Sequence, residues 1–254
     1  MISKKSFLKV FIGSFFIQAA WSFEKMQTLG FAAAISPAIK DVFKDDAQSG
    51  NLAMRRHMSF YNAHPYMASP VLGAAIKLEE AGMRGECPVD NALRFRSRVM
   101  APLSAIGDLF FWGALRPLAS CAGILAALIW GLWGPVVFLA VYNVFHISAR
   151  WFGLKKGYAL GEAVIGFVTS LALPRWGARA RLASAFMLGF FLAYGIRLSL
   201  NMADVRALAP SSIAFAAALV LVAVFSLLLK RGWKVAGLVY LATIPLIIIG
   251  VLFF

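Results

Sequence analysis

The chain has 254 residues, of which 61% are hydrophobic, and it carries 25 basic against 11 acidic residues, a net charge of +14. Its mean hydropathy of +0.78 is too high for an ordinary soluble domain, so the composition indicates a polytopic membrane protein. The basic excess would suit nucleic-acid binding, but the basic residues form short clusters beside apolar segments, which favours a membrane-orientation signal; we expect no nucleic-acid partner.

The cysteines and histidines give no sign of a metal centre. Cys87, Cys121 and three histidines are not closely spaced in the sequence. A disulfide and a structural zinc site are therefore not expected, and we predict neither a bound metal nor another cofactor.

Residues 1–22 combine a basic start with an apolar middle, as a signal peptide does. Lys9 interrupts the apolar run, however, and Gln18 and Trp21 stand where a cleavage region needs small residues. The apolar residues recur at helical spacing beside three lysines, which predicts an uncleaved interfacial helix, with the signal peptide as the alternative.

The next part of the chain reads as short helical pieces separated by breaks. Residues 32–39 end near Pro37, and a charged, loop-like stretch follows. Residues 51–61 form a helix that must stop before Pro65, and residues 71–81 form another that begins after Pro70. Neither is long enough to cross a bilayer, so the polar stretch between them, FYNAHPYMASP, is predicted to be re-entrant or buried.

The second part of the chain is mostly membrane in character. Residues 119–147 are long and apolar but are interrupted by Gly131, Gly134 and Pro135, which fits either the broken helix of a transporter or an ordinary kinked helix. Residues 161–173 are too short to span alone. The predicted spans are 183–200, 211–229 and 235–254.

Two basic clusters, at 175–181 and 230–234, are expected on the cytoplasmic side, which leaves the C-terminus external. The sequence therefore predicts an all-α polytopic membrane protein with an interfacial N-terminal helix, broken helices in its first part and several transmembrane helices in its second. We expect a single membrane domain over 1–254, with a motif region at 1–100 and mainly transmembrane helices at 101–254.

Three polar constellations stand out from the apolar background. WSFEKMQTLGF contains Glu24 and Gln27, which would share one helix face. RRHMSFYNAHPYMASPVLGAAIKLEE contains Asn62 and His64, and APLSAIGDLFFWGALRP contains Asp108 in an apolar run. A carboxylate in such a run is a functional candidate, although Asp108 could instead be a helix cap.

These segments, in this order, resemble the IID component of the mannose-type sugar phosphotransferase system. The similar blocks extend from about residue 21 to about residue 161 and are FEKMQTLGFAAAISPAI, RRHMSFYNAHPYMASPVLGAAIKLEE, MAPLSAIGDLFFWGALRPL and NVFHISARWFGLKKGYALG. The chain departs from the family pattern at Ala101 and Ala105, where glycine is usual, and at Phe23, where asparagine is frequent before the motif glutamate. The match after residue 161 is poor.

The resemblance implies a transport subunit of the bacterial cytoplasmic (inner) membrane. Such a subunit pairs with a IIC membrane partner, in a higher oligomer of IIC–IID pairs, to form the translocation path for a hexose or related sugar. The IIB component, supplied by IIA, phosphorylates the sugar. No catalytic or phosphoryl-carrying residue is expected in this chain, His64 included. The alanines at 101 and 105 motivate an alternative, a non-transporting scaffold or regulatory subunit. A self-sufficient enzyme or secondary transporter lacks support, because no phosphate loop, metal set or nucleophile constellation appears.

A sugar site suits the residue types in these motifs, because hydroxyls both donate and accept hydrogen bonds and sugar rings have apolar faces. The predicted substrate-binding residues are Glu24, Gln27, Asn62, His64 and Asp108. Aromatic rings that could pack against the sugar are Trp21, Tyr61, Tyr66 and Trp112, with core packing or interface anchoring as the alternative. Three further polar residues are interpreted as interfacial anchors: Asn143, His146 and Arg150.

Overall fold

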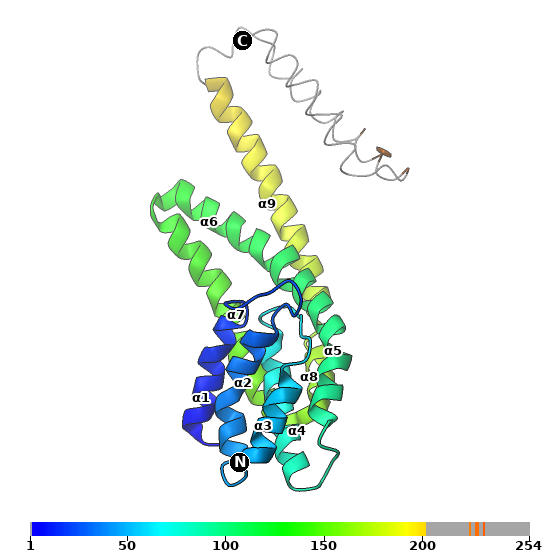
Figure 1. Cartoon of the computed structure of the whole chain (residues 1–254). Coiled ribbons are helices and arrows are strands. Elements are labelled where there is room, and N and C mark those ends of the chain that lie inside the picture. Colours follow the sequence, from blue (N-terminus) through cyan, green and yellow to red (C-terminus); the bar gives the residue numbers. More distant parts are fainter. Residues whose placement is uncertain (1, 202–223, 225–226, 229–230, 232–254) are drawn as a thin grey trace. The chain divides into compact units, whose positions relative to one another are not determined.

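The computed structural model describes residues 2–201 and, beyond them, residues 224, 227, 228 and 231 (Figure 1). The chain divides into two compact units, Met1–Leu188 and Gly189–Phe254. The predicted spans 211–229 and 235–254 lie outside the described residues apart from these isolated positions. That residues 1–254 form one membrane domain stays a prediction.

Helices make up the regular structure, and the described residues contain no strand, only isolated bridges. In chain order the elements are α1 (Lys4–Gly13), η1 (Ser14–Phe16), α2 (Thr28–Val42), α3 (Ala47–His57), α4 (Ala68–Met83), α5 (Asn91–Gly107), the π-helix η2 (Asp108–Leu115), α6 (Arg116–Trp130), α7 (Trp133–Leu160), η3 (Gly161–Ala163), α8 (Val164–Ser170) and α9 (Leu173–Asn201).

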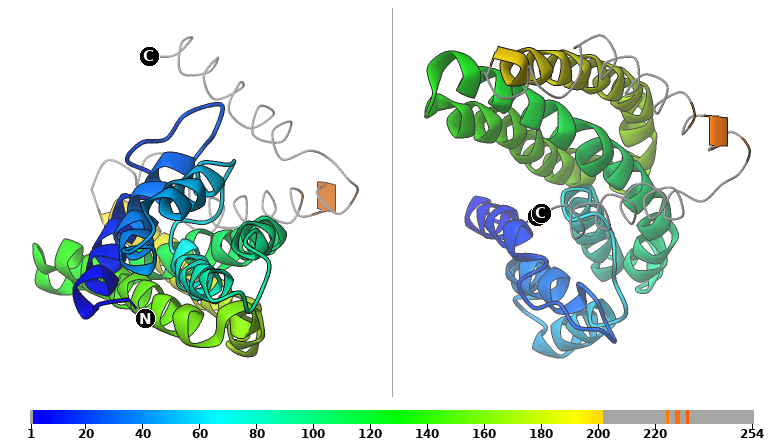
Figure 2. Two further views of the ribbon diagram at one scale, coloured as in Figure 1. Left: turned by 60° about the horizontal axis from the view of Figure 1, so that its bottom comes forward. Right: turned by 90° about the horizontal axis from the view of Figure 1, so that it is seen from above.

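The short helices α1 to α4 lie beside one another at the N-terminal end of the first unit (Figure 2). Their shared apolar core draws on residues at helical spacing, such as Ala34, Ile35, Ala38 and Ile39 of α2, each at most 1% exposed. The long helix α7 closes this bundle by packing on α4. The approach is close because Gly73 of α4 faces Gly157 of α7, where a side chain would meet backbone atoms of the opposite helix.

Helices α6 and α7 form a hairpin that extends away from the bundle (Figure 1). The turn is made by Gly131, whose φ of +60° lies in the left-handed region that favours glycine. Gly134 lets the two helices approach, because a Cβ there would stand 2.7 Å from the Gly123 carbonyl oxygen. Residues 119–147 are therefore two helices joined by a tight turn, neither a broken membrane helix nor a single kinked one.

Prolines end fewer helices than the sequence predicted. Helix α2 continues through Pro37, and α5 continues through Pro102 into the π-helix. Helix α4 begins at Ala68, so Pro70 lies in its first turn, where the missing N–H is no loss. At Pro37 the burial of neighbouring apolar side chains on both sides outweighs the local preference for a break. Helix α3 ends at His57, earlier than predicted.

Two helical stretches, Asn91–Trp130 and Trp133–Gly195, are long and apolar enough to cross a membrane. Large apolar side chains are exposed on them, among them Leu128, Ile129, Trp130, Trp133 and Phe186. In water so much exposed apolar surface would be unfavourable, whereas lipid is its natural solvent. The predicted span at 183–200 lies within α9.

Candidate functional site

His64 is the centre of the site, in the irregular segment between α3 and α4. Its side chain is 1% exposed and stacks on Phe111 of the π-helix, with ring centroids 5.2 Å apart and planes inclined by 17°. Trp112 and Tyr66 flank the same imidazole, each with its ring centroid 4.8 Å from that of His64. The segment predicted to be re-entrant or buried is thus buried at His64.

The hydrogen bonds of His64 define its protonation. The backbone N–H of Tyr66 donates to Nδ1 at 3.3 Å, so the ring proton lies on Nε2. Burial and, secondarily, the Arg150 guanidinium lower the pKa of His64 to about 4, which keeps the imidazole neutral at pH 7. Nε2 is buried and has no hydrogen-bond partner among the described residues.

The glycine–aspartate motif lies directly against this histidine. A Cβ at Gly107 would stand 2.4 Å from both Cβ and Cγ of His64, so only glycine admits the imidazole there. Asp108 is partly exposed and begins the π-helix, an element that occurs often at functional sites. Its side chain caps no helix end, and within the described part of the chain it forms no hydrogen bond or ion pair.

Gln27 joins the first motif to the same segment. The side chain is buried, its Oε1 accepts a hydrogen bond from Ala63 N at 3.3 Å, and its backbone N–H donates to Tyr61 O at 2.9 Å. Glu24 is exposed and lies on a turn closed by backbone hydrogen bonds between Ser22 and Met26.

The predicted helix face shared by Glu24 and Gln27 is therefore wrong. The chain around Glu24 is a turn rather than a helix. Met26 within it has a φ of +50°, which is uncommon for a residue other than glycine and cannot be predicted from the residue type.

Asn62 is exposed at the edge of the site, and its backbone N–H contacts Met100 Sδ at 3.0 Å. The structure thus brings together Gln27, His64 and the motif of Asp108, while Glu24 and Asn62 are exposed to the outside of the unit. That these five residues bind substrate stays a prediction.

Helix α7 supplies residues that the sequence did not assign to the site. Tyr142 and Tyr66 share a hydrogen bond between their hydroxyl groups at 3.1 Å, and His146 stacks on Tyr66 with centroids 4.7 Å apart and planes inclined by 24°. The Arg150 guanidinium lies 4.9 Å from the centre of the Tyr66 ring and donates to the Ser14 carbonyl oxygen.

The interpretation of Arg150 as an interfacial anchor is wrong, because its side chain is only 3% exposed. The spacing of Tyr142, His146 and Arg150, four residues apart on one face of a helix, is the sequence signal that indicates their common role.

The candidate aromatic residues separate into two kinds. Tyr61 is fully buried and packs on Phe31, with ring centroids 4.4 Å apart, so packing explains it. Trp112 is 45% exposed while one part of it covers His64, and Trp21 is 53% exposed. Trp112 therefore combines contact with the buried site and access from outside.

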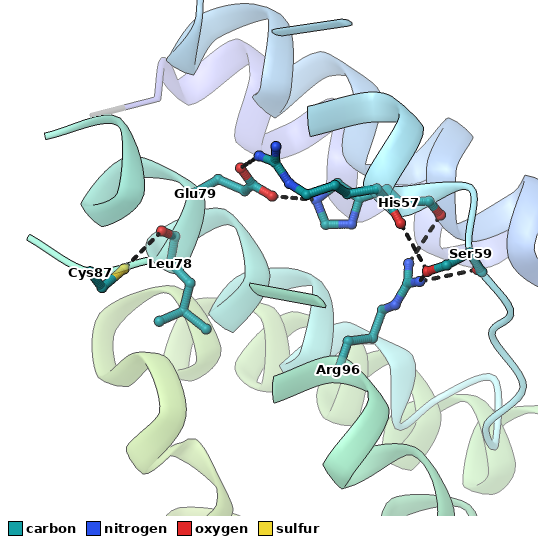
Figure 3. Close-up of polar contacts among 7 residues, drawn as sticks. His57, Ser59, Leu78, Glu79, Cys87 and Arg96 are labelled. Atoms are coloured by element: carbon teal, nitrogen blue, oxygen red, sulfur yellow. Dashed lines mark hydrogen bonds and ion pairs between the residues drawn. The ribbon is translucent and has the colours of Figure 1, made fainter. Parts of the chain in front are cut away.

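A second buried polar cluster joins α3, α4 and α5 (Figure 3). Glu79 of α4 is 2% exposed; one carboxylate oxygen accepts from Arg56 Nη2 at 2.8 Å and the other lies 3.1 Å from His57 Nε2. Burial lowers the pKa of His57, because it outweighs the opposite effect of Glu79, so His57 is neutral and the charged pair is Arg56 with Glu79.

The two long apolar helical stretches, together with a polar segment held inside a bundle of shorter helices, define an all-α membrane protein. The sequence comparison specifies the family. The family model of the PTS system mannose/fructose/sorbose family IID component matches residues 1–254, and the chain belongs to this family. The resemblance expected from the motifs is confirmed.

Curated relatives agree with this assignment. The chain is 32% identical over 181 residues to the mannose-specific EIID component of Escherichia coli strain K12, an alignment that covers 71% of this chain and 64% of the relative. It is 32% identical over 195 residues to the sorbose-specific EIID component of Lacticaseibacillus casei (75% and 68% covered) and 28% identical over 189 residues to the fructose permease IID component of Bacillus subtilis strain 168 (74% and 68%). The chain thus spans less than two thirds of the Escherichia coli relative's length.

Solved structures confirm an all-α membrane fold. The mannose transporter ManYZ, in its complex with microcin E492, contains a chain with a TM-score of 0.61 and 30% identity, with 74% of this chain and 69% of that chain covered. A second structure, described as a membrane protein, has a TM-score of 0.71 at 24% identity over 98% of this chain and 96% of the other, which shows likeness of fold alone.

Proposed function

We propose that the chain is the IID subunit of a phosphoenolpyruvate-dependent sugar permease of the mannose type. With a IIC partner it forms the translocation path for a hexose or related sugar, which IIB phosphorylates. The observation that carries the proposal is the meeting of the three motif segments at His64. Relatives named for mannose, sorbose and fructose support a sugar of this size.

The proposed sugar site consists of Glu24, Gln27, Asn62, His64 and Asp108. The neutral His64 imidazole offers an Nε2–H donor, and the Asp108 carboxylate, whose side chain has no partner among the described residues, offers acceptors, which together suit the hydroxyl groups of a sugar. The half-exposed Trp112 ring beside them is suited to the apolar face of a sugar. Asn62 and Glu24, both exposed, would contact the sugar where it enters or leaves.

The chain itself carries no phosphoryl group in this proposal. A phosphocarrier histidine must be accessible to a soluble donor protein, a far larger partner than a sugar, whereas His64 is 1% exposed and lies among Phe111, Trp112 and Tyr66. Phosphoryl transfer therefore belongs to IIA and IIB. The complex would lie in the bacterial cytoplasmic membrane as a higher oligomer of IIC–IID pairs, with the C-terminus of this chain external.

One observation favours active transport over a scaffold. The alanines that replace the usual family glycines, Ala101 and Ala105, are exposed on α5, where a methyl group is accommodated. The glycine of the same motif that His64 requires, Gly107, is retained. The departures therefore leave the geometry around His64 intact.

The test is phosphoenolpyruvate-dependent uptake of radiolabelled mannose, fructose and sorbose in cells that lack their own mannose-type permease and express this chain with IIA, IIB and IIC. We expect uptake of at least one sugar, reduced at least about tenfold by His64→Ala and lowered by Asn62→Ala, at unchanged membrane abundance. Glu86→Gln, an exposed substitution outside the motif blocks, is the control. Normal uptake by the His64 and Asn62 variants would refute the site, and full uptake without IIC would refute the subunit role.

A further inference from the structure

Arg96 of α5 is a buried cation that the motifs do not include. Its side chain is 0% exposed, and within the described part of the chain it forms no ion pair with a carboxylate. Nη1 donates to the His57 carbonyl oxygen at 3.0 Å, and Nη2 donates to the Ser59 carbonyl oxygen at 3.0 Å and also to Ser59 Oγ (Figure 3). A buried charge is costly, so this arrangement needs an explanation.

The partners of Arg96 lie at the end of a helix. Helix α3 ends at His57, and the last carbonyl groups of a helix lack partners within it and carry partial negative charge. A guanidinium satisfies the last helical carbonyl, that of His57, and the Ser59 carbonyl just beyond the helix at once. Its planar fork offers several donors in fixed directions, which a lysine ammonium does not. The faces of Phe31 and Tyr61, with centroids 5.1 and 5.5 Å from the guanidinium carbon, add cation–π attraction.

Helix α5, which carries Arg96, contacts the polar segment at a second place. Arg96 and Gly107 are eleven residues apart, close to three helical turns, so both lie on one face of α5. Arg96 holds the chain at His57 and Ser59, and Gly107 receives the ring of His64. Helix α5 therefore fixes both ends of the stretch that precedes and includes His64.

We propose that Arg96 is a positioning residue for residues 60–64, the segment that carries Asn62 and His64. It contacts no sugar; it fixes where α3 ends and hence where His64 meets Gly107. The effect of Arg96 on transport rests on the proposed function. The holding of the His57 and Ser59 carbonyls by Arg96, called the clamp below, can be tested without transport.

The clamp is tested by cysteine labelling with N-ethylmaleimide in membranes. Cys87 and Cys121 are first replaced by serine and alanine, and Ala63→Cys, 3% exposed beside His64, reports on the segment. Ala53→Cys, 0% exposed in α3, reports on the bundle. With Arg96→Lys we expect labelling at position 63 to accelerate at least tenfold, while position 53 stays protected.

The matched control is Arg98→Lys on the same helix, whose exposed side chain pairs with Glu162. It should change neither labelling rate. Unchanged labelling at position 63 in Arg96→Lys would overturn the clamp. Accelerated labelling at both positions would reduce Arg96 to a general structural role and would equally overturn the proposal.

Transport distinguishes positioning from stability. At equal membrane abundance, Arg96→Lys should raise the KM for uptake of the transported sugar, tested with mannose, fructose and sorbose, by about tenfold, with a smaller change in maximal rate. Ser59→Ala, which removes the hydroxyl that accepts from Arg96 and donates to the Arg56 carbonyl but leaves both backbone acceptors of Arg96, should raise KM in the same direction but less. Local release of position 63 with an unchanged KM would overturn the positioning role. If wild type takes up none of the sugars, the proposed function fails, while the labelling result still decides the clamp.

Discussion

Gly73 offers the most direct test of how α4 and α7 pack. A Cβ at this position would stand 2.2 Å from the Leu154 carbonyl oxygen and 2.6 Å from the Tyr158 backbone nitrogen. Ordinary contact begins at 3.4 Å, so in Gly73→Ala the helices must separate by about 1.2 Å or distort. Overpacking costs about 1–3 kcal/mol, and alanine recovers up to about 1 kcal/mol through its higher helix propensity.

Because both clashing atoms belong to the backbone and cannot rotate away, we expect a net destabilisation of about 2 kcal/mol, or a Tm about 4–8 °C lower. The assay is heating of the detergent-solubilised protein, followed by the fraction that remains monodisperse in size-exclusion chromatography. Gly166→Ala is the control, because a Cβ added to this exposed glycine of α8 would have no neighbouring atom within 4 Å, and its Tm should stay the same or rise slightly. A Gly73→Ala protein as stable as wild type would refute the close approach of the helices.

Three further predictions concern the polar residues. Gly107→Ala should lower sugar uptake at least about tenfold at equal abundance by displacing His64, whereas Ala105→Gly, on the exposed face, should not. Glu79→Gln should cost about 3 kcal/mol by leaving its partly buried cationic partner, Arg56, without a counter-charge, measured as a lower Tm, whereas Glu86→Gln in an exposed pair should leave Tm unchanged. Because the pKa of His64 is about 4 in the folded chain, only the unfolded chain binds this proton as the pH drops from about 6.5 to about 4. The free energy of unfolding therefore falls by about 3 kcal/mol over this range. His64→Gln should flatten this part of the curve of Tm against pH.

Local chemistry predicts much of the helical layout. Gly131 marks the turn between α6 and α7, and the length of the apolar run at 161–173 already indicates a short element, which is α8. Pro37 and Pro102 are misleading signals, because a buried apolar face on either side of a proline can stabilise the helix by more than the lost hydrogen bond costs. At Met26 the positive φ has no counterpart in the residue type, so the turn before α2 could not be foreseen.

The site depends on contacts that no local pattern encodes. His64 and Asp108 stand out because polar residues in apolar surroundings are costly. This argument does not depend on where the two residues lie in the folded chain. That Tyr66 meets Tyr142 across 76 positions of sequence follows only from the packing of α7 against α4. Arg96 is equally hidden, because in the sequence it is one arginine in a basic cluster and in the structure it is fully buried.

The polar segment of residues 60–66 is therefore not a loop that determines its own shape. Helix α5 holds it through Arg96 and Gly107, Gln27 holds it through two hydrogen bonds, and α7 holds it through Tyr66. Each of these contacts joins distant parts of the chain, so the position of His64 depends on the bundle as a whole. It follows that a substitution at a holding residue should affect transport as strongly as one at Asn62, although the holding residue never meets the sugar. Such equal effects are expected of a site whose geometry is set by tertiary packing, and not of a site whose geometry is set by the local sequence of its own loop.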